Sequence, residues 1–308
     1  MVIRAFLTHK LSESYKDCQD SFDILVPKRS VAVADGISQS IFSKVWADLL
    51  TYHFVRNPSV IFLEEENVDP IRDEWYQRVA EVRLEKERQN DPYLWKLDEN
   101  LASGRSAGAT FLGLRFEGTA WSCLVLGDSC LVGISENNEI MEIMSSKTED
   151  EEFDNYPDYL DSSRLISQKG ESKCFHGELT GSGKLFLVTD ALSDYLYRKR
   201  QENDFAVVDA LLNIQTQDEF EAIVGAMRLQ GMTNDDTTLV IIENDGKEIW
   251  SVPFETDLEN LIKKGLPDNE PVIAKSFCFE SCMDNIILSQ ISPLASGMYL
   301  SSEINLSE

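Results

Sequence analysis

The chain has 308 residues, with 54 Asp and Glu against 28 Lys and Arg, which gives a formal net charge of −26 at pH 7. Nucleic acids and anionic membrane surfaces are bound through clustered Lys and Arg, so this balance argues against both as partners. Hydrophobic residues make up 43% of the chain, enough to bury a substantial core, so the composition excludes a disordered protein.

From its apolar runs we expect neither a signal peptide nor a membrane helix in the chain. Its first ten residues contain no apolar stretch of signal-peptide length, and no later run approaches the roughly 20 apolar residues of a membrane helix. Six cysteines are scattered along the chain without a CxxC pair, as is typical of free thiols in a reducing compartment. We therefore expect a cytoplasmic protein.

The N-terminal part reads as strands followed by a helix. Strands are expected at 1–8, 22–26 and 31–34, separated by polar turns. The hydrophobic period then becomes helical, and one broad apolar face runs over 37–54. The helix is expected to stop before the Asn-Pro pair that follows.

A second helical region should start at Asp69-Pro70, where an N-cap residue precedes a proline in the first helical position. An Asn-Asp-Pro sequence at 90–92 predicts an interruption, and the region should end near Ala102.

A β meander is expected next. Its four apolar strands are 109–116, 120–126, 130–134 and 140–144, with turn residues between them. Residues 145–183 are polar and irregular and carry an acidic run, which favours a solvated loop.

The remaining elements show either the strand-like or the helical pattern of apolar residues. In chain order they are a strand at 184–189, helices near 204–214 and 218–230, a strand at 237–242, a weaker strand at 248–253 and a short helix at 257–265.

Strands therefore come in blocks and helices in pairs, without regular βαβ alternation, so strands within a block should be antiparallel neighbours. Two antiparallel sheets flanked by helix pairs would bury these faces, which predicts an α+β fold with four layers, α-β-β-α. We expect a domain at 1–246 and a C-terminal extension of unassigned role at 247–308.

Aspartates stand at the ends of apolar strands. Asp35, Asp128 and Asp190 each follow a strand, Asp235 precedes one, and Asp20 is a fifth candidate. A single such aspartate is ordinary, because Asp forms turns. Convergent carboxylates, however, repel one another unless they are protonated or neutralised, and an all-oxygen ligand set suits Mg²⁺ and Mn²⁺. With three histidines and no HExxH motif, zinc chemistry is disfavoured.

Five short motifs around these aspartates resemble the protein phosphatase 2C family of metal-dependent Ser/Thr protein phosphatases, in their order and approximate spacing. They are Val33-Ala-Asp35-Gly36, Gly108-Ala-Thr110, Gly127-Asp128-Ser129, Val188-Thr-Asp190-Ala-Leu-Ser-Asp194 and Asp235-Asp236-Thr-Thr-Leu-Val240. The resemblance covers roughly residues 1–243.

The resemblance implies a site with two Mn²⁺ or Mg²⁺ ions and a set of catalytic ligands. Asp35 would bridge both metals, and the Gly36 carbonyl would bind the first. Asp190 and Asp235 would complete the second site, and Asp20 would act through water. Asp35, Asp190 and Asp235 are the residues expected to be essential for catalysis.

The resemblance further implies a possible third, weaker metal at Asp128 and Asp194. The expected reaction is attack of a metal-bridging hydroxide on the phosphorus of a phosphorylated protein, without a covalent phosphoenzyme. The protein substrate and the oligomeric state are left open.

Departures from the family pattern keep a second hypothesis open. Tyr15 stands near the usual phosphate-binding Arg, Gln19 replaces a Glu, and Ala191 replaces a Gly; Lys10 or Lys16 could substitute for the Arg. The alternative is a phosphatase-like regulatory or binding module with weakened catalysis. All direct metal-ligand positions are present, which favours the enzyme.

Overall fold

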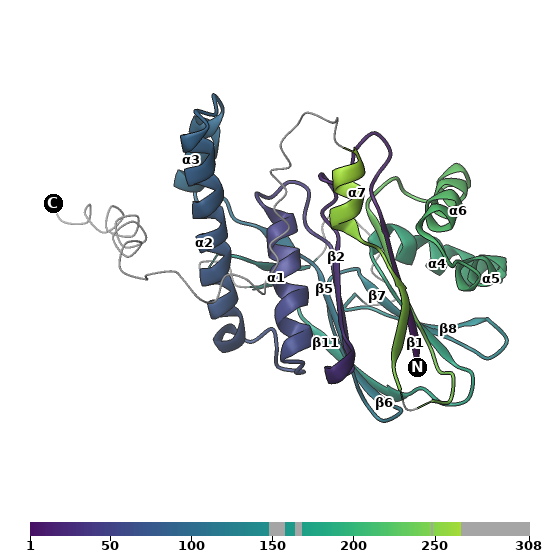
Figure 1. Ribbon diagram of the computed structural model, residues 1–308. Helices are drawn as coiled ribbons and strands as arrows, with labels where there is room; N and C mark the ends of the chain where they lie inside the picture. The colour runs from purple at the N-terminus through teal and green to yellow at the C-terminus, as the bar shows by residue number, and fades with distance from the viewer. Residues whose placement is uncertain (148–157, 164–167, 248, 266–308) are drawn as a thin grey trace.

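The computed structural model describes residues 1–147, 158–163, 168–247 and 249–265, which fold into four layers (Figure 1). Two β-sheets lie face to face in the middle, and helices cover the outer face of each. This arrangement confirms the α+β four-layer sandwich predicted from the sequence.

Each central sheet mixes strands from distant parts of the chain. The six-stranded sheet has the order β14 (Ser251–Glu255), β1 (Val2–Thr8), β13 (Thr237–Glu243), β12 (Lys184–Val188), β7 (Cys130–Ile134), β8 (Ile140–Met144). The five-stranded sheet has the order β11 (Lys173–Glu178), β6 (Ala120–Leu126), β5 (Phe111–Glu117), β3 (Ser30–Ala34), β2 (Ser21–Leu25). A small third sheet contains β10 (Gln168–Lys169), β9 (Tyr159–Asp161) and β4 (Gly108–Ala109).

The helices divide between the two outer faces. On the five-stranded side lie α1 (Ser43–Arg56), α2 (Glu65–Arg88) and α3 (Leu94–Ala102). On the six-stranded side lie α4 (Asp190–Glu202), α5 (Ala206–Leu212) and α6 (Gln217–Leu229). A short 3-10 turn, Val26–Lys28, joins β2 to β3, and α7 (Leu258–Gly265) follows β14.

Three apolar layers hold the sandwich together. Ile3 of β1 packs between the sheets, whereas Phe6 of the same strand packs under the helices, stacked on Phe220 with ring centroids 5.3 Å apart. Successive side chains of a strand alternate between faces, so a strand buried on both faces shows a continuous apolar run. Trp46 and Trp75 fill the third layer, between the five-stranded sheet and its helices.

The predicted meander at 109–144 was wrong as a single unit, although all four strands exist. β5 and β6 belong to one sheet and β7 and β8 to the other, so the chain changes sheets after Leu126. Gly127 makes the change at φ +99°, and a Cβ there would lie 2.6 Å from the Asp158 carbonyl oxygen. Apolar alternation specifies a strand but not its partner, which is why the pattern could not separate the pairs.

Two helix starts also differ from expectation. α1 begins at Ser43, because the backbone N–H groups of Ile37 and Ile41 bond instead to the carbonyls of Gly108 and Ser106. α2 begins at Glu65, so the proline that was expected to open this helix lies inside it.

The structure has a helix, α4, over 190–202 that the sequence patterns above do not include. Its buried residues Ala191, Leu192, Tyr195 and Leu196 do follow helical spacing, so a signal was present among many charged residues.

The segment 145–183 is less irregular than predicted, since β11 pairs with β6; residues 148–157 and 164–167 lie outside the described part. Beyond residue 246, the expected strand and helix are present as β14 and α7. β14 pairs with β1 in parallel, an exception to the otherwise antiparallel central sheets. Residues 266–308 lie outside the described part.

Candidate metal centre

Four of the expected ligand positions lie at one end of the two sheets. Ser21 pairs with Ala34, so Asp20 and Asp35 leave their strands side by side. In the other sheet, the strand that ends before Asp190 is paired with the strand that begins after Asp235. Antiparallel neighbours place the end of one strand beside the start of the next, which brings distant aspartates together.

Asp35 and Asp190 lie in the interior of this cluster. Burial, followed by the charges of Asp20, Asp190 and Asp128, raises the pKa of Asp35 well above its ordinary value. Burial and the charges of Asp128 and Asp235 raise the pKa of Asp190 in the same way. The carboxylates therefore repel one another, and a divalent cation among them would reverse these shifts.

Asp20 is fully buried and held by two hydroxyl groups. Its Oδ2 accepts hydrogen bonds from Thr189 Oγ1 at 2.9 Å and Thr238 Oγ1 at 2.8 Å. Burial and the charge of Asp236 nevertheless raise the pKa of Asp20 to about 7. Its Oδ1 is buried and has no hydrogen-bond partner in the described structure, which leaves one oxygen for a water or a cation.

The adjacent residues Asp235 and Asp236 have different roles. Both oxygens of Asp236 accept backbone N–H groups, from Lys10 at 3.0 Å and Gln19 at 2.8 Å, so this side chain ties the N-terminal loop in place. Asp235 Oδ1 instead accepts the Lys10 ammonium at 2.7 Å and the Asp236 amide at 2.8 Å. Asp235 is therefore the aspartate of this pair that has an ionic partner at the cluster.

Lys10 is a fixed cation at this site. Burial alone would lower the pKa of Lys10, but its hydrogen bond to Asp235 and the charges of Asp235 and Asp236 outweigh burial and raise it. The Ser38 hydroxyl oxygen lies 3.2 Å from the Lys10 ammonium and accepts a hydrogen bond from it. From the sequence we did not predict this contact, the ion pair between Lys10 and Asp235 or the hydrogen bonds of the two threonines to Asp20. The threonines carried a signal, because they are polar residues at the ends of apolar strands.

The Gly36 position accepts only glycine. A Cβ there would lie 2.9 Å from the Gln19 carbonyl oxygen and 3.0 Å from the Ser43 backbone. The Gly36 N–H donates to that same Gln19 carbonyl, which closes the loop after Asp35 against the loop before Asp20. A side chain would push these two loops apart.

Asp128 and Asp194 are placed differently from each other. Asp128 is buried where the chain changes sheets, and its charge acts on both Asp35 and Asp190. Asp194 lies one helical turn after Asp190 in α4 and is ion-paired to Arg198 at 3.1 Å. The cluster therefore includes Asp128, whereas Asp194 lies at its edge.

Of the residues near the expected phosphate-binding position, Tyr15 is bound away from the aspartates, whereas Lys10 lies among them. The Tyr15 hydroxyl donates to Glu221 and accepts from Gln217 Nε2 at 2.9 Å, so this side chain is anchored on α6. Lys16 is exposed. Gln19 Oε1 is buried without a hydrogen-bond partner in the described structure.

The donor set suits a hard divalent cation, although the side chains are not arranged for immediate ligation. Within the described ranges, no three acidic, histidine or cysteine side chains converge closely enough to hold a metal ion as they stand. Lys10 binds an oxygen of Asp235, and the two threonines bind one oxygen of Asp20. The unpartnered oxygen of Asp20 and the raised pKa values still fit all-oxygen ligation of Mg²⁺ or Mn²⁺.

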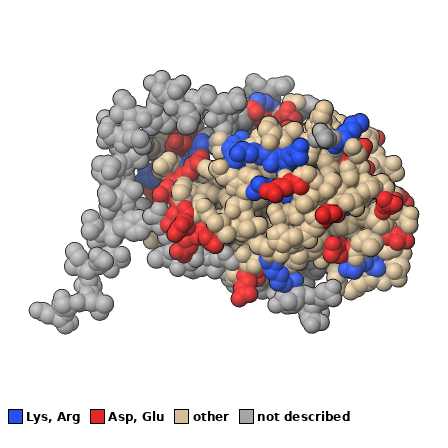
Figure 2. Space-filling view, turned by 90° about the horizontal axis from the view of Figure 1, so that it is seen from below, with Lys and Arg blue, Asp and Glu red and all other residues tan. Residues whose placement is uncertain are grey.

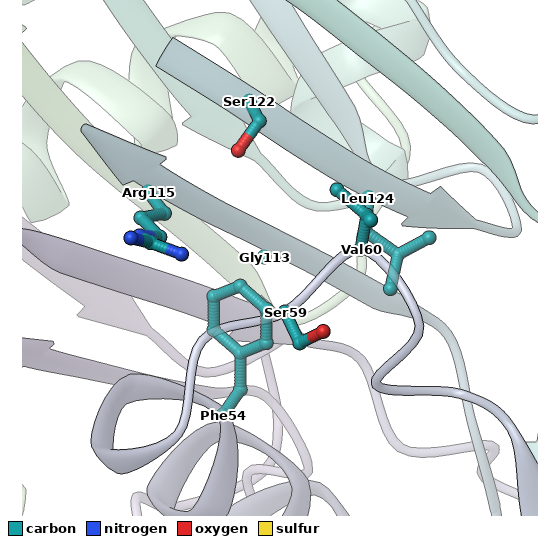
Figure 3. Close-up of a pocket in the computed structure, with 7 residues that line it drawn as sticks. All are labelled: Phe54, Ser59, Val60, Gly113, Arg115, Ser122 and Leu124. Carbon is teal, nitrogen blue, oxygen red and sulfur yellow. The ribbon is translucent and has the colours of Figure 1, made fainter. Parts of the chain in front are cut away.

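Figure 2 shows the molecule from below, where β1 begins, and on that face basic and acidic side chains are interspersed. A pocket on the outer face of the five-stranded sheet lies under the loop between α1 and α2 (Figure 3). Its lining contains none of the clustered aspartates: Phe54, Ser59, Val60, Gly113, Arg115, Ser122 and Leu124.

Two of the properties expected from composition can be compared with the structure. Cys18, Cys123, Cys130 and Cys174 are free thiols, whereas Cys278 and Cys282 lie outside the described part. Among the described helices, none combines the length and the apolar character needed to cross a bilayer.

Comparisons with known proteins give a family match and several similar structures. The family model described as Protein phosphatase 2C matches residues 12–232. A bacterial serine phosphatase structure is 15% identical, with a TM-score of 0.50, and the match covers 80% of this chain and 99% of that one. PppA from Pseudomonas aeruginosa is 17% identical, with a TM-score of 0.46, over 79% and 98% of the two chains.

A further similar structure is the catalytic domain of the Ser/Thr protein phosphatase PstP, solved with two manganese ions. It is 15% identical, with a TM-score of 0.46, and the match covers 78% of this chain and 96% of that one. No curated protein matches the chain. At these identities the structural likeness concerns the fold.

Proposed function

The chain belongs to the protein phosphatase 2C family, and on that premise we propose that it is a Mn²⁺- or Mg²⁺-dependent phosphatase of phosphoserine and phosphothreonine in proteins. The observation that carries the proposal is the gathering of Asp20, Asp35, Asp128, Asp190 and Asp235 at one end of the sandwich. Such a cluster is costly in a folded protein unless cations neutralise it.

In this proposal the chain supplies ligands from both sheets. Asp35 would bridge two cations and the Gly36 carbonyl would bind the first, while Asp190 and Asp235 would hold the second. Asp20 would act through a water on its unpartnered oxygen. When bound, divalent cations at such a site supply hydroxide near neutral pH and neutralise the charge of the phosphate.

The surrounding residues fix the ligands before any substrate arrives. Thr189 and Thr238 hold Asp20 in one orientation, and the Asp236 amide holds Asp235. These fixed partners limit how far the two side chains must move when a cation binds. A third cation would use Asp128 and Asp194, and it would have to displace Arg198 from Asp194.

The cations would also decide whether the substrate can approach. The chain carries a net charge of −26, so a phosphate dianion is repelled at long range. Substrate affinity should therefore depend steeply on metal occupancy.

The test is hydrolysis of p-nitrophenyl phosphate and of a phosphothreonine peptide by the purified chain with Mn²⁺. We expect turnover that EDTA abolishes and that Asp35→Asn removes. Asp17→Asn is the matched control, because Asp17 is exposed in the loop before β2 and bonds only locally, to Ser14. Wild-type activity in Asp35→Asn would overturn the proposal.

A phosphatase-like binding module remains a second candidate function, because Tyr15 is anchored on α6 and no Arg stands at its position. Mn²⁺ titration calorimetry separates the two. A module that has lost its metal site would show no heat of binding at millimolar Mn²⁺, whereas the enzyme would bind and turn over a phosphopeptide.

A further inference from the structure

Lys10 lies between the two halves of the cluster. Its ammonium group is 2.7 Å from Asp235 Oδ1, on the side of the six-stranded sheet, and it donates to Ser38 Oγ at 3.2 Å, in the loop after Gly36 on the other side. The Lys10 side chain is only 16% exposed. A partly buried charge pair of this kind is screened by solvent less than a surface pair.

The backbone around Lys10 is fastened to the same turn that carries Asp235. The Lys10 amide donates to Asp236 Oδ1 at 3.0 Å, and the Leu11 amide donates to Asn234 Oδ1 at 2.8 Å. Arg228 joins the two segments by donating to the carbonyls of both His9 and Asp235. The ammonium group is therefore kept at Asp235 by a fixed backbone, while its four-carbon stem can still turn.

We propose that Lys10 is an internal competitor for the divalent cation at Asp235, so that metal loading at this carboxylate requires the ammonium group to leave it. The inference rests on the proposed function. Asp235 Oδ1 already accepts two hydrogen bonds, from Lys10 and from the Asp236 amide, and a metal on this carboxylate would bring a second cation beside the ammonium. Like charges at such a distance repel strongly in a site with limited water.

Removing Lys10 should change metal affinity in one direction if the lysine competes with the metal and in the other if it only supports the fold. A lysine that only supports the fold would weaken metal binding when it is removed. A competing lysine would strengthen metal binding when it is removed, because the cation then meets a carboxylate without an ammonium group beside it.

Mn²⁺ titration calorimetry on the full chain measures whether the affinity rises or falls. We expect Lys10→Met to bind Mn²⁺ about threefold to tenfold more tightly than the wild type, and Lys10→Arg to bind no more tightly than the wild type. Lys16→Met is the matched control, since Lys16 is an exposed lysine of the same loop, and it should bind as the wild type does.

A double-mutant cycle assigns the effect to Asp235. In an Asp235→Asn background, Lys10→Met should no longer tighten Mn²⁺ binding. Thermal unfolding gives an independent readout: at one fixed Mn²⁺ concentration, the rise in Tm over the EDTA sample should be larger for Lys10→Met than for the wild type. Lys10→Gln serves in the same way if the methionine variant does not fold.

The outcomes separate the two proposals. If the wild type binds Mn²⁺ and Lys10→Met binds it equally or more weakly, the Lys10 proposal is overturned and the proposed function stands. If the wild type binds no Mn²⁺, the proposed function is overturned, and the Lys10 proposal with it.

Discussion

The aspartate cluster has two parts that differ in how their negative charge can be neutralised. The interior contains Asp20, Asp35 and Asp190, and the edge contains Asp235 and Asp194. In the described structure, Asp35 and Asp190 have no Lys or Arg ion-pair partner and face other carboxylates. At the edge, Asp235 is paired with Lys10 and Asp194 with Arg198. The interior can be neutralised only by protons or by a cation from solution, whereas the chain supplies the cations of the edge itself.

The largest expected difference in activity is between variants of Asp190 and of Asp194. Because both residues lie on α4, the two variants can be compared directly. Asp190→Asn should lower kcat/KM with Mn²⁺ by about a thousandfold or more, since it removes an interior ligand charge worth roughly 4 kcal/mol of transition-state stabilisation. Asp194→Asn should lower it less than about tenfold. Steady-state hydrolysis of p-nitrophenyl phosphate measures both, and equal losses would remove the distinction between interior and edge.

The two threonine hydroxyl groups that bind Asp20 should stabilise the folded protein while this carboxylate is ionised. Thr238→Val removes one donor to a buried carboxylate with little change in volume, and should cost about 1–3 kcal/mol of unfolding free energy at pH 8. The loss should shrink at pH 5, where Asp20 takes up a proton. Denaturant unfolding in EDTA is the measurement. Thr51→Val, a buried threonine bonded within α1 and to Ser21, should show a loss that does not change with pH.

The pH dependence of stability follows from the raised pKa values of the interior. Asp20 has an ordinary pKa of 3.8 and a folded pKa of about 7, so between these values the folded state holds more protons than the unfolded state. Unfolding free energy in EDTA should therefore fall as pH rises from about 4 to 7. With saturating Mn²⁺ the slope should weaken or reverse. A flat profile in EDTA would show that the interior charges are already compensated.

The smallest expected effect is at the outer end of the cluster. Arg198→Met removes the partner of Asp194 on a partly exposed helix face, and should change the unfolding free energy by less than about 1 kcal/mol. Thermal unfolding with and without Mn²⁺ would measure it. A loss as large as that of Thr238→Val would place Asp194 in the interior instead.

The sequence predicted most strands and the ends at which the aspartates stand, because both signals are local. Alternation of apolar residues marks a strand, and Asp35 or Asp190 directly after such a run marks its end. The same locality explains the errors. Nothing in 109–144 says that β7 leaves the sheet of β6. The apolar face at 37–42 resembled a helix, although the N–H groups of Ile37 and Ile41 bond to the carbonyls of Gly108 in β4 and of Ser106 just before it.

Strand pattern and motif order by themselves predicted the four-layer fold and the family, which are confirmed, and the acidic residues proposed for the centre. The tertiary structure decided which of those residues share an interior and which bring their own cation. Lys10 and Asp235 are separated by 225 positions, and only the pairing of β1 with β13 brings them together. The role of a charge depends on which charges and how much water surround it, and those are set by the packing of the two sheets.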